Sequence, residues 1–154
     1  MLPLTLQQVD ELTADVAAVI APCLYNPTPE KLNVLMRLYK TDPNRSLYAC
    51  VDGDSVFAII GLKRNPTENT AVILHIAVTE ERRGQGVGRQ LIDDVLALHS
   101  LAAIQAETDR EAVAFYRSCG FAVESLGEVY PGVERFLCMK KNEAGLAGKR
   151  ESAR

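Results

Sequence analysis

The chain has 154 residues, of which 47% are hydrophobic and 24% are charged, and its formal net charge is -3. This length suits one globular domain with a core of its own, and the composition is ordinary for a soluble protein. The acidic balance argues against a general nucleic-acid binder, and the apolar runs are too short to span a membrane.

The first residues and the cysteines both point to the cytoplasm. The N-terminus has neither a basic segment nor a long apolar run, so no signal peptide is predicted. No two cysteines form a C-x-x-C pair, and we expect free thiols and no metal site. The cysteines are Cys23, Cys50, Cys119 and Cys138.

Two helices are predicted in the N-terminal part of the chain. The first is expected to begin at the capping box Thr5–Gln8 and to end at Pro22, with one apolar face made by Val9, Leu12, Val16 and Ile20. Thr28 and Pro29 supply the N-cap and the first helical residue of the second helix, which stops before Asp42. Its apolar stripe is Leu32, Leu35, Met36 and Tyr39.

Strands are predicted through the rest of the chain, separated by two helices. Asp52-Gly53 is a strong hairpin signal between the first two strands. One later helix has the apolar face Val87, Leu91, Val95 and Leu98. The expected strands are 46–51, 55–63, 70–78, 101–107, 121–126 and 133–140.

The last part of the chain holds a short helix, a hairpin and a tail. Asp109 is expected to cap that helix and Gly120 to be its C′ residue, with a stripe of Ala112, Phe115, Tyr116 and Cys119. The last two strands are joined by a loop containing Gly127, Pro131 and Gly132. Residues 1–141 are predicted to be one domain and 142–154 a frayed polar tail.

The chain is organised around a strand, a glycine-rich turn and a helix, which together span 71–98. This combination binds phosphate, because glycines allow close approach and the free N–H groups of a helix start point at the anion. The P-loop motif is absent. A dinucleotide motif would need a third glycine after Gly84 and Gly86, and that position is Arg89.

The segment Arg83–Gly88 matches [QR]-x-x-G-x-[GA], and Leu74–Val78 precedes it. Downstream, Phe115-Tyr116 and Gly120-Phe121 form an F-Y-x-x-x-G-F signature. In these features the chain resembles the GNAT N-acetyltransferases over about residues 46 to 140. The resemblance implies an α/β fold, with a mixed central sheet flanked by helices. The family's short first strand could here only be Leu2–Leu4.

The resemblance also implies acetyl-CoA as co-substrate. Its pyrophosphate would be held by the glycine turn, at Arg83, Gly84, Gln85, Gly86, Val87, Gly88 and Arg89. Its pantetheine arm would pair with the strand backbone, at Ile76, Ala77 and Val78. The purely structural alternatives are that the glycine turn only starts a helix, without a ligand, and that the strand only packs in the core.

Tyr116 corresponds to the family residue whose hydroxyl reaches the thioester sulfur, so the resemblance implies that it protonates the departing thiolate. Packing in the core is the alternative for Tyr116. The general base stays open. In the ribosomal-protein acetyltransferase branch of the family, a Glu lies twelve residues before the Tyr, but that position here is Ile104, which cannot accept a proton. His75 and Glu107 are the remaining candidates. Asp109 matches a family Asn, and an N-cap explains either residue.

The predicted function is direct transfer of acetyl from acetyl-CoA to a primary amine. The acceptor stays open between a small-molecule amine and a protein amino group, with a weak preference for a cation from the acidic balance. We expect no nucleic-acid or membrane partner, and a monomer or homodimer. A non-catalytic module that binds acetyl-CoA and regulates a partner is the alternative.

Overall fold

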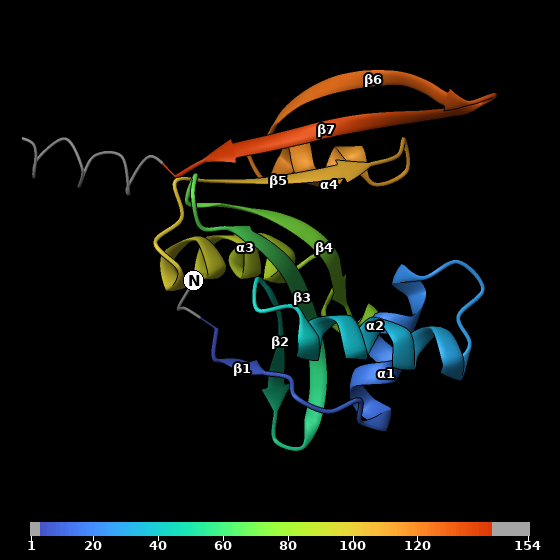
Figure 1. The fold of residues 1–154 in the computed structure, drawn as a ribbon, viewed down its shortest axis with the longest axis vertical. Coiled ribbons are helices and arrows are strands. Elements are labelled where there is room, and N and C mark those ends of the chain that lie inside the picture. Colours follow the sequence, from blue (N-terminus) through green and yellow to red (C-terminus); the bar gives the residue numbers. More distant parts are fainter. Residues whose placement is uncertain (1–3, 143–154) are drawn as a thin grey trace, which may run out of the picture. The chain divides into compact units, whose positions relative to one another are not determined.

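The computed structural model describes residues 4–142. Seven strands form one mixed sheet in the order β1-β2-β3-β4-β5-β7-β6, as Figure 1 shows. The helices are α1 (Ala14–Ile20), α2 (Pro29–Thr41), α3 (Val87–Leu98) and α4 (Val113–Ser118), and short 3₁₀ turns cover Ala21–Cys23 and Glu80–Arg82. The strands are β1 (Leu6–Gln8), β2 (Arg45–Asp52), β3 (Ser55–Asn65), β4 (Thr70–Val78), β5 (Ala103–Thr108), β6 (Ala122–Tyr130) and β7 (Val133–Lys141).

The contacts of the described residues divide into two compact units. The first comprises residues 4–64 and 74–94, and the second comprises residues 65–73 and 95–142.

In the first unit, α1 and α2 cover one face of the antiparallel strands β2 and β3 (Figure 1). The shared core draws on the inward faces of both helices and both strands, because burial of apolar surface is the main force that holds these layers together. Its buried residues are Val16, Val19, Ile20, Leu35, Met36, Tyr39, Leu47, Ala49 and Ile59.

The predicted start of the first helix is wrong. Leu6–Gln8 is a strand that pairs with the edge of β2, and α1 begins only at Ala14, where the Thr13 hydroxyl accepts the N–H of Val16 at 3.2 Å. Pairing with an open sheet edge satisfies more backbone groups than one capping box does. The first strand is therefore present, but at 6–8 and not at the expected Leu2–Leu4, of which residues 2 and 3 lie outside the described residues.

The second helix and the hairpin follow the sequence closely. The Thr28 hydroxyl caps α2 by accepting the N–H of Lys31, and Pro29 is the first helical residue, as expected. In the hairpin, Asp52 pairs with Ser55, so the turn residues are Gly53 and Asp54, one position later than expected. Gly53 has φ +63°, which this tight turn requires.

In the second unit, β5 lies parallel to β4 at Thr70–Val72 and antiparallel to β7 along its whole length. The helix α4 ends as expected, in a Schellman motif. The N–H of Phe121 donates to the Tyr116 carbonyl at 3.1 Å, and that of Gly120, which has φ +88°, donates to Arg117 at 3.0 Å.

The last hairpin is longer than predicted. β6 runs to Tyr130, so that Gly127 lies at an irregularity within the strand and only Pro131 and Gly132 form the turn. The sequence signal was weak because β6 is almost fully exposed, and no buried face imposes a period of two on it.

The face that α3 buries differs from the predicted stripe. Leu98 of α3 is 54% exposed, whereas Ile92 and Leu96 are buried, so the apolar face of this helix is rotated from the predicted stripe. None of the four cysteines, all of which lie within residues 4–142, forms a disulfide, as predicted. No helix within residues 4–142 is long and apolar enough to cross a membrane. Apart from residue 142, the predicted tail lies outside the described residues.

Candidate functional site

The glycine turn of the first unit connects β4 to α3. A 3₁₀ turn at Glu80–Arg82 follows the strand, and the helix begins at Val87. Gly84 has φ +75° and Gly86 has φ +80°, in the left-handed region where a side chain would be strained. The turn is therefore built on glycine at these two positions, and it is exposed from Arg83 to Gly86.

The start of α3 presents backbone donors. The first helical hydrogen bond of this segment runs from the N–H of Gln90 to the Gly86 carbonyl at 3.0 Å. The N–H groups of Val87–Arg89 precede it, and the first N–H groups of a helix have no partner within the helix. Such donors, together with the positive end of the helix dipole, suit an anion.

Two of the three arginines near the turn hold the turn itself. Arg82 forms an ion pair with Asp52, and its guanidinium lies 4.5 Å from the centre of the Phe57 ring. Arg83 donates from Nε to the Val78 carbonyl at 3.0 Å, which ties the turn back to the end of β4. Backbone N–H groups are therefore the main candidates for phosphate contacts, and the arginines add positive charge around the turn.

The second candidate feature is the end of β4. The ladder between β4 and β5 covers Thr70–Val72, and Ile76–Val78 lie beyond it. The Ile76 carbonyl accepts a hydrogen bond from the Cys23 thiol at 3.4 Å. The Thr79 hydroxyl is buried, and it has no hydrogen-bond partner among the described residues. The sequence carries no signal for the contact of the Cys23 thiol or for the buried hydroxyl of Thr79.

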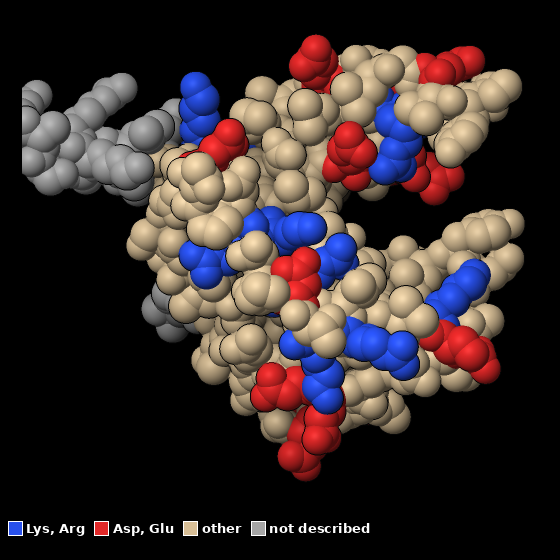
Figure 2. All heavy atoms as spheres, viewed as in Figure 1, with Lys and Arg blue, Asp and Glu red and all other residues tan. Residues whose placement is uncertain are grey.

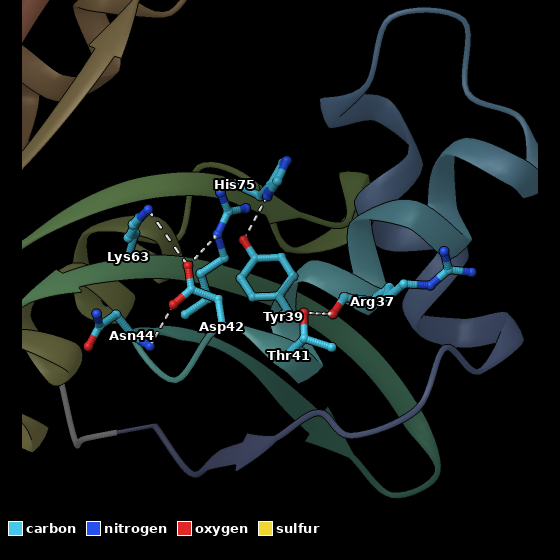
Figure 3. A network of polar contacts seen from close by, with 8 residues as sticks. Arg37, Tyr39, Thr41, Asp42, Asn44, Lys63 and His75 are labelled. Atoms are coloured by element: carbon cyan, nitrogen blue, oxygen red, sulfur yellow. Dashed lines mark hydrogen bonds and ion pairs between the residues drawn. The ribbon is translucent and has the colours of Figure 1, made fainter.

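His75 makes a hydrogen bond that the sequence does not predict. Tyr39 of α2 lies with its hydroxyl 2.7 Å from His75 Nδ1, and the two rings meet edge to face (Figure 3). Burial lowers the pKa of His75, and the positive charge of Arg45 lowers it further. Burial likewise raises the pKa of Tyr39 above its ordinary value, so the phenol stays protonated.

Asp42 follows α2 and lies between two cations. Its Oδ2 is 3.3 Å from Arg45 Nε and 3.6 Å from Lys63 Nζ. The backbone N–H of Asn44 donates to its Oδ1 at 2.9 Å, and this bond is the largest cause of the lowered pKa of Asp42. The dashed lines of Figure 3 mark these contacts.

Tyr116 belongs to the second unit, where its ring is buried. It packs edge to face on Phe115 and on Phe121, with ring centres 5.1 and 5.2 Å apart. The packing interpretation therefore holds for the ring, and the role of its hydroxyl stays a prediction. Of the two candidates for the general base, Glu107 is exposed on β5. Ile104, which is excluded as a base, is buried.

Contrary to the prediction, Asp109 does not cap α4, because the N-cap residue of this helix is Ala112 and no side chain caps it. Asp109 instead stabilises the turn that leads into the helix. Its Oδ1 accepts the backbone N–H groups of Glu111 and Ala112, each at 3.0 Å, ahead of α4. Within residues 4–142, no three His, Cys, Asp or Glu side chains come together as a metal site.

Residues 13–121 match the sequence profile of the acetyltransferase (GNAT) family. Among solved structures, a GNAT-family protein of Desulfovibrio desulfuricans is 20% identical with a TM-score of 0.69, over 90% of this chain and 98% of that one. A chimera built on the Vibrio cholerae spermidine N-acetyltransferase is 19% identical with a TM-score of 0.69, over 93% and 98%.

A third structure, from Bacillus anthracis, is named for a streptothricin acetyltransferase and holds acetyl coenzyme A. It is 26% identical with a TM-score of 0.59, over 69% of this chain and 67% of that one.

Proposed function

The chain belongs to the GNAT family of acetyltransferases, and we propose that it transfers the acetyl group of acetyl-CoA directly to a primary amine. The observation that carries the proposal is the glycine turn at the start of α3, where the left-handed residues Gly84 and Gly86 directly precede the first N–H groups of the helix. These donors suit the pyrophosphate of acetyl-CoA. The acetyl-CoA complex of the Bacillus anthracis protein supports the same co-substrate.

In this proposal Arg83–Arg89 hold the pyrophosphate, and the backbone of Ile76–Val78 pairs with the pantetheine arm. The end of the β4–β5 ladder at Val72 supports the second assignment, because backbone beyond a ladder can accept a new partner. The Cys23 thiol already donates to the Ile76 carbonyl, whose second lone pair remains for a ligand.

The reaction needs a neutral amine and a proton for the leaving group. The amine nitrogen attacks the acyl carbon, the carbon–sulfur bond breaks, and the thiolate takes the proton of the Tyr116 hydroxyl. The amine proton passes to water. A phenol with a reference pKa of about 10 can donate to a thiolate, and it regains its proton from solvent.

The proposed setting is the cytoplasm, where free thiols persist. The enzyme would act as a monomer or homodimer on a small-molecule amine or a protein amino group, without nucleic acid. One observation favours a non-catalytic acetyl-CoA module instead: Tyr116 is packed between aromatic rings, as a core residue would be.

Release of CoA thiol from acetyl-CoA with a panel of amines separates the two functions. The enzyme proposal predicts amine-dependent thiol release with a matching mass gain of acetyl on the amine. Binding of acetyl-CoA with no release for any amine would favour the regulatory module.

A further inference from the structure

A cationic cluster lies on the face of the first unit that α1 and α2 cover. Side chains alternate along a strand, so Arg45 shares the face of Leu47 in the core beneath α2, and Lys63 is its cross-strand partner on β3. Asp42 is the only carboxylate paired with either cation within residues 4–142, so this trio carries a net positive charge. In Figure 2, lysine and arginine side chains are spread over the face that carries α2.

His75 faces the same helix, where Tyr39 reaches it across a narrow passage over β3. Tyr39 is buried, and its hydroxyl passes directly over Gly61 of β3 to reach His75. A Cβ on Gly61 would lie 1.8 Å from the Tyr39 hydroxyl oxygen and 2.5 Å from the ring carbon that bears it. Glycine at this position is therefore what allows the Tyr39–His75 hydrogen bond.

The hydrogen bond determines which nitrogen of His75 carries the proton. Within the described residues the Tyr39 hydroxyl has no other partner, so a buried O–H would be unsatisfied unless it donated to Nδ1. Nδ1 therefore accepts, and the neutral ring carries its proton on Nε2. In this tautomer Nε2 has no lone pair for an amine proton, and His75 presents an N–H donor.

Two donors remain on this face. His75 Nε2–H and the terminal amino groups of Arg45 have no hydrogen-bond partner among residues 4–142, since Arg45 uses only Nε toward Asp42. Burial and the charge of Arg45 both lower the pKa of His75 and keep the imidazole neutral, so it does not repel the guanidinium beside it. A neutral donor next to a cation suits an anionic oxygen.

The position of these donors along β4 connects them to the acceptor. This step rests on the proposed function: with the pyrophosphate at Gly84–Gly88 and the pantetheine arm running from Val78 to Ile76, the acyl end arrives next to His75. The attacking amine must approach that end. Groups on this face therefore contact the acceptor and not the nucleotide part of the co-substrate.

We propose that the acceptor is an amino acid, and that its carboxylate binds the His75 Nε2–H and the Arg45 guanidinium while its amine attacks the thioester. The cluster disfavours polyamines, because a second ammonium group would meet Arg45 and Lys63 with only Asp42 to balance them. The net charge of -3 favours a cationic acceptor, whereas the local charge at this face favours an acceptor that carries a carboxylate.

Matched acceptor pairs test the proposal. Lysine and cadaverine, arginine and agmatine, and tyrosine and tyramine differ only in the carboxylate. We expect kcat/KM for CoA thiol release to favour the carboxylate member by at least about tenfold, the factor expected of a charge-assisted hydrogen bond. Equal values within each pair, or a preference for the decarboxylated amines or for spermidine, would overturn the proposal.

Substitutions test which residues cause the preference for acceptors that carry a carboxylate. Arg45→Gln should lower kcat/KM about ten- to hundredfold for the carboxylate members and leave the decarboxylated amines within about threefold. Lys40→Gln is the matched control, because it removes a charge from an exposed position of α2 and should keep the preference. Arg45→Lys keeps the positive charge, so it separates a loss of kcat/KM caused by the missing charge from one caused by unfolding. Thermal melting of each variant checks that it is folded.

Ring nitrogen NMR tests the geometry without turnover. The chain has two histidines, His75 and His99, so His75→Gln assigns the signals. We expect wild-type His75 to carry its proton on Nε2, Tyr39→Phe to lose that preference, and lysine but not cadaverine to shift the Nε2 signal in the presence of CoA. Wild-type His75 protonated on Nδ1, or no shift with lysine, arginine or tyrosine, would overturn the proposal even if no amine is acetylated. Failure of acetyl-CoA to bind would instead refute the proposed function.

Discussion

The two regions that we propose bind anions lie before and after Ile76–Val78 in the first unit, and they present different kinds of donor. The glycine turn uses backbone N–H groups in an exposed loop, and left-handed glycines give it its shape. The face around His75 uses side chains, one of them positioned by a buried tyrosine from α2. The turn is local in sequence, whereas Tyr39 and His75 are 36 residues apart.

This difference predicts how each region can be broken. A backbone site survives the loss of neighbouring side chains, but it fails when a charge or a bulky group enters the turn. A side-chain site fails when a single donor or its support is removed. The glycine turn should therefore control affinity for acetyl-CoA, and the His75 face should control the choice of acceptor.

The largest effect is expected for Tyr116→Phe, because neither region supplies a proton for the departing thiolate. Tyr116→Phe keeps the buried ring and its contacts with Phe115 and Phe121, and it removes only the hydroxyl. Loss of a general acid typically lowers kcat about 10²–10⁴-fold, and acetyl-CoA affinity should hardly change. Steady-state kinetics with an active amine gives both values. Tyr130→Phe, at an exposed tyrosine of the same unit, is the control. Turnover within about threefold of wild type would assign Tyr116 to packing alone.

A second substitution tests the support of His75. Gly61→Ala forces the Tyr39 ring away from β3, and overpacking of this kind costs about 1–3 kcal/mol of unfolding free energy. Urea unfolding measures the change. The same substitution beside Tyr39→Leu, where the clash is absent, should cost at least about 1 kcal/mol less. Equal costs in both backgrounds would mean that Tyr39 does not lie over Gly61.

Tyr39→Phe separates the two regions. Loss of the hydroxyl should reduce stability by about 0.5–1.5 kcal/mol, the net value of one hydrogen bond. Affinity for acetyl-CoA, measured by titration calorimetry, should stay within about twofold, because the backbone of the glycine turn is untouched. A large loss of acetyl-CoA affinity would show that the two regions act as one site.

The smallest expected effect is on the pH dependence of stability. The folded pKa of His75 lies below its unfolded value, so the unfolded state binds more protons over the interval between them. Stability from this group is present above the unfolded pKa of about 6.5 and is lost as the pH falls through the folded pKa. His75→Gln should flatten the fall in urea midpoint on acidification from about pH 7.5 toward pH 5, and an unchanged slope would contradict the lowered pKa.

The conformation of the glycine turn could be predicted from sequence because its backbone imposes a spacing on the glycines. Gly84 and Gly86 are needed at left-handed positions between a strand and a helix, so the constraint is written in consecutive residues. The Schellman end of α4 is legible for the same reason, since Gly120 is adjacent to the helix it ends.

The His75 face could not be predicted, because it depends on the register of α2 over β3. The apolar stripe correctly placed Tyr39 in the core, but a stripe says nothing of where a hydroxyl points. The same limit explains the error near the N-terminus. Val9 and Leu12 do pack against the predicted core, yet pairing with β2 and not the helical spacing decided the conformation of Leu6–Gln8.

Thermal melting with and without acetyl-CoA tests whether the glycine turn binds the pyrophosphate of acetyl-CoA. Acetyl-CoA at about 100 times its dissociation constant should stabilise the wild type by about 2.7 kcal/mol, and Gly86→Asp should abolish the shift. Gly132→Asp is the matched control, because Gly132 has φ +77° in an exposed turn of the last hairpin, so it carries the same strain and charge without the site. A shift with NAD but not with acetyl-CoA, or an equal shift in wild type and Gly86→Asp, would contradict the account.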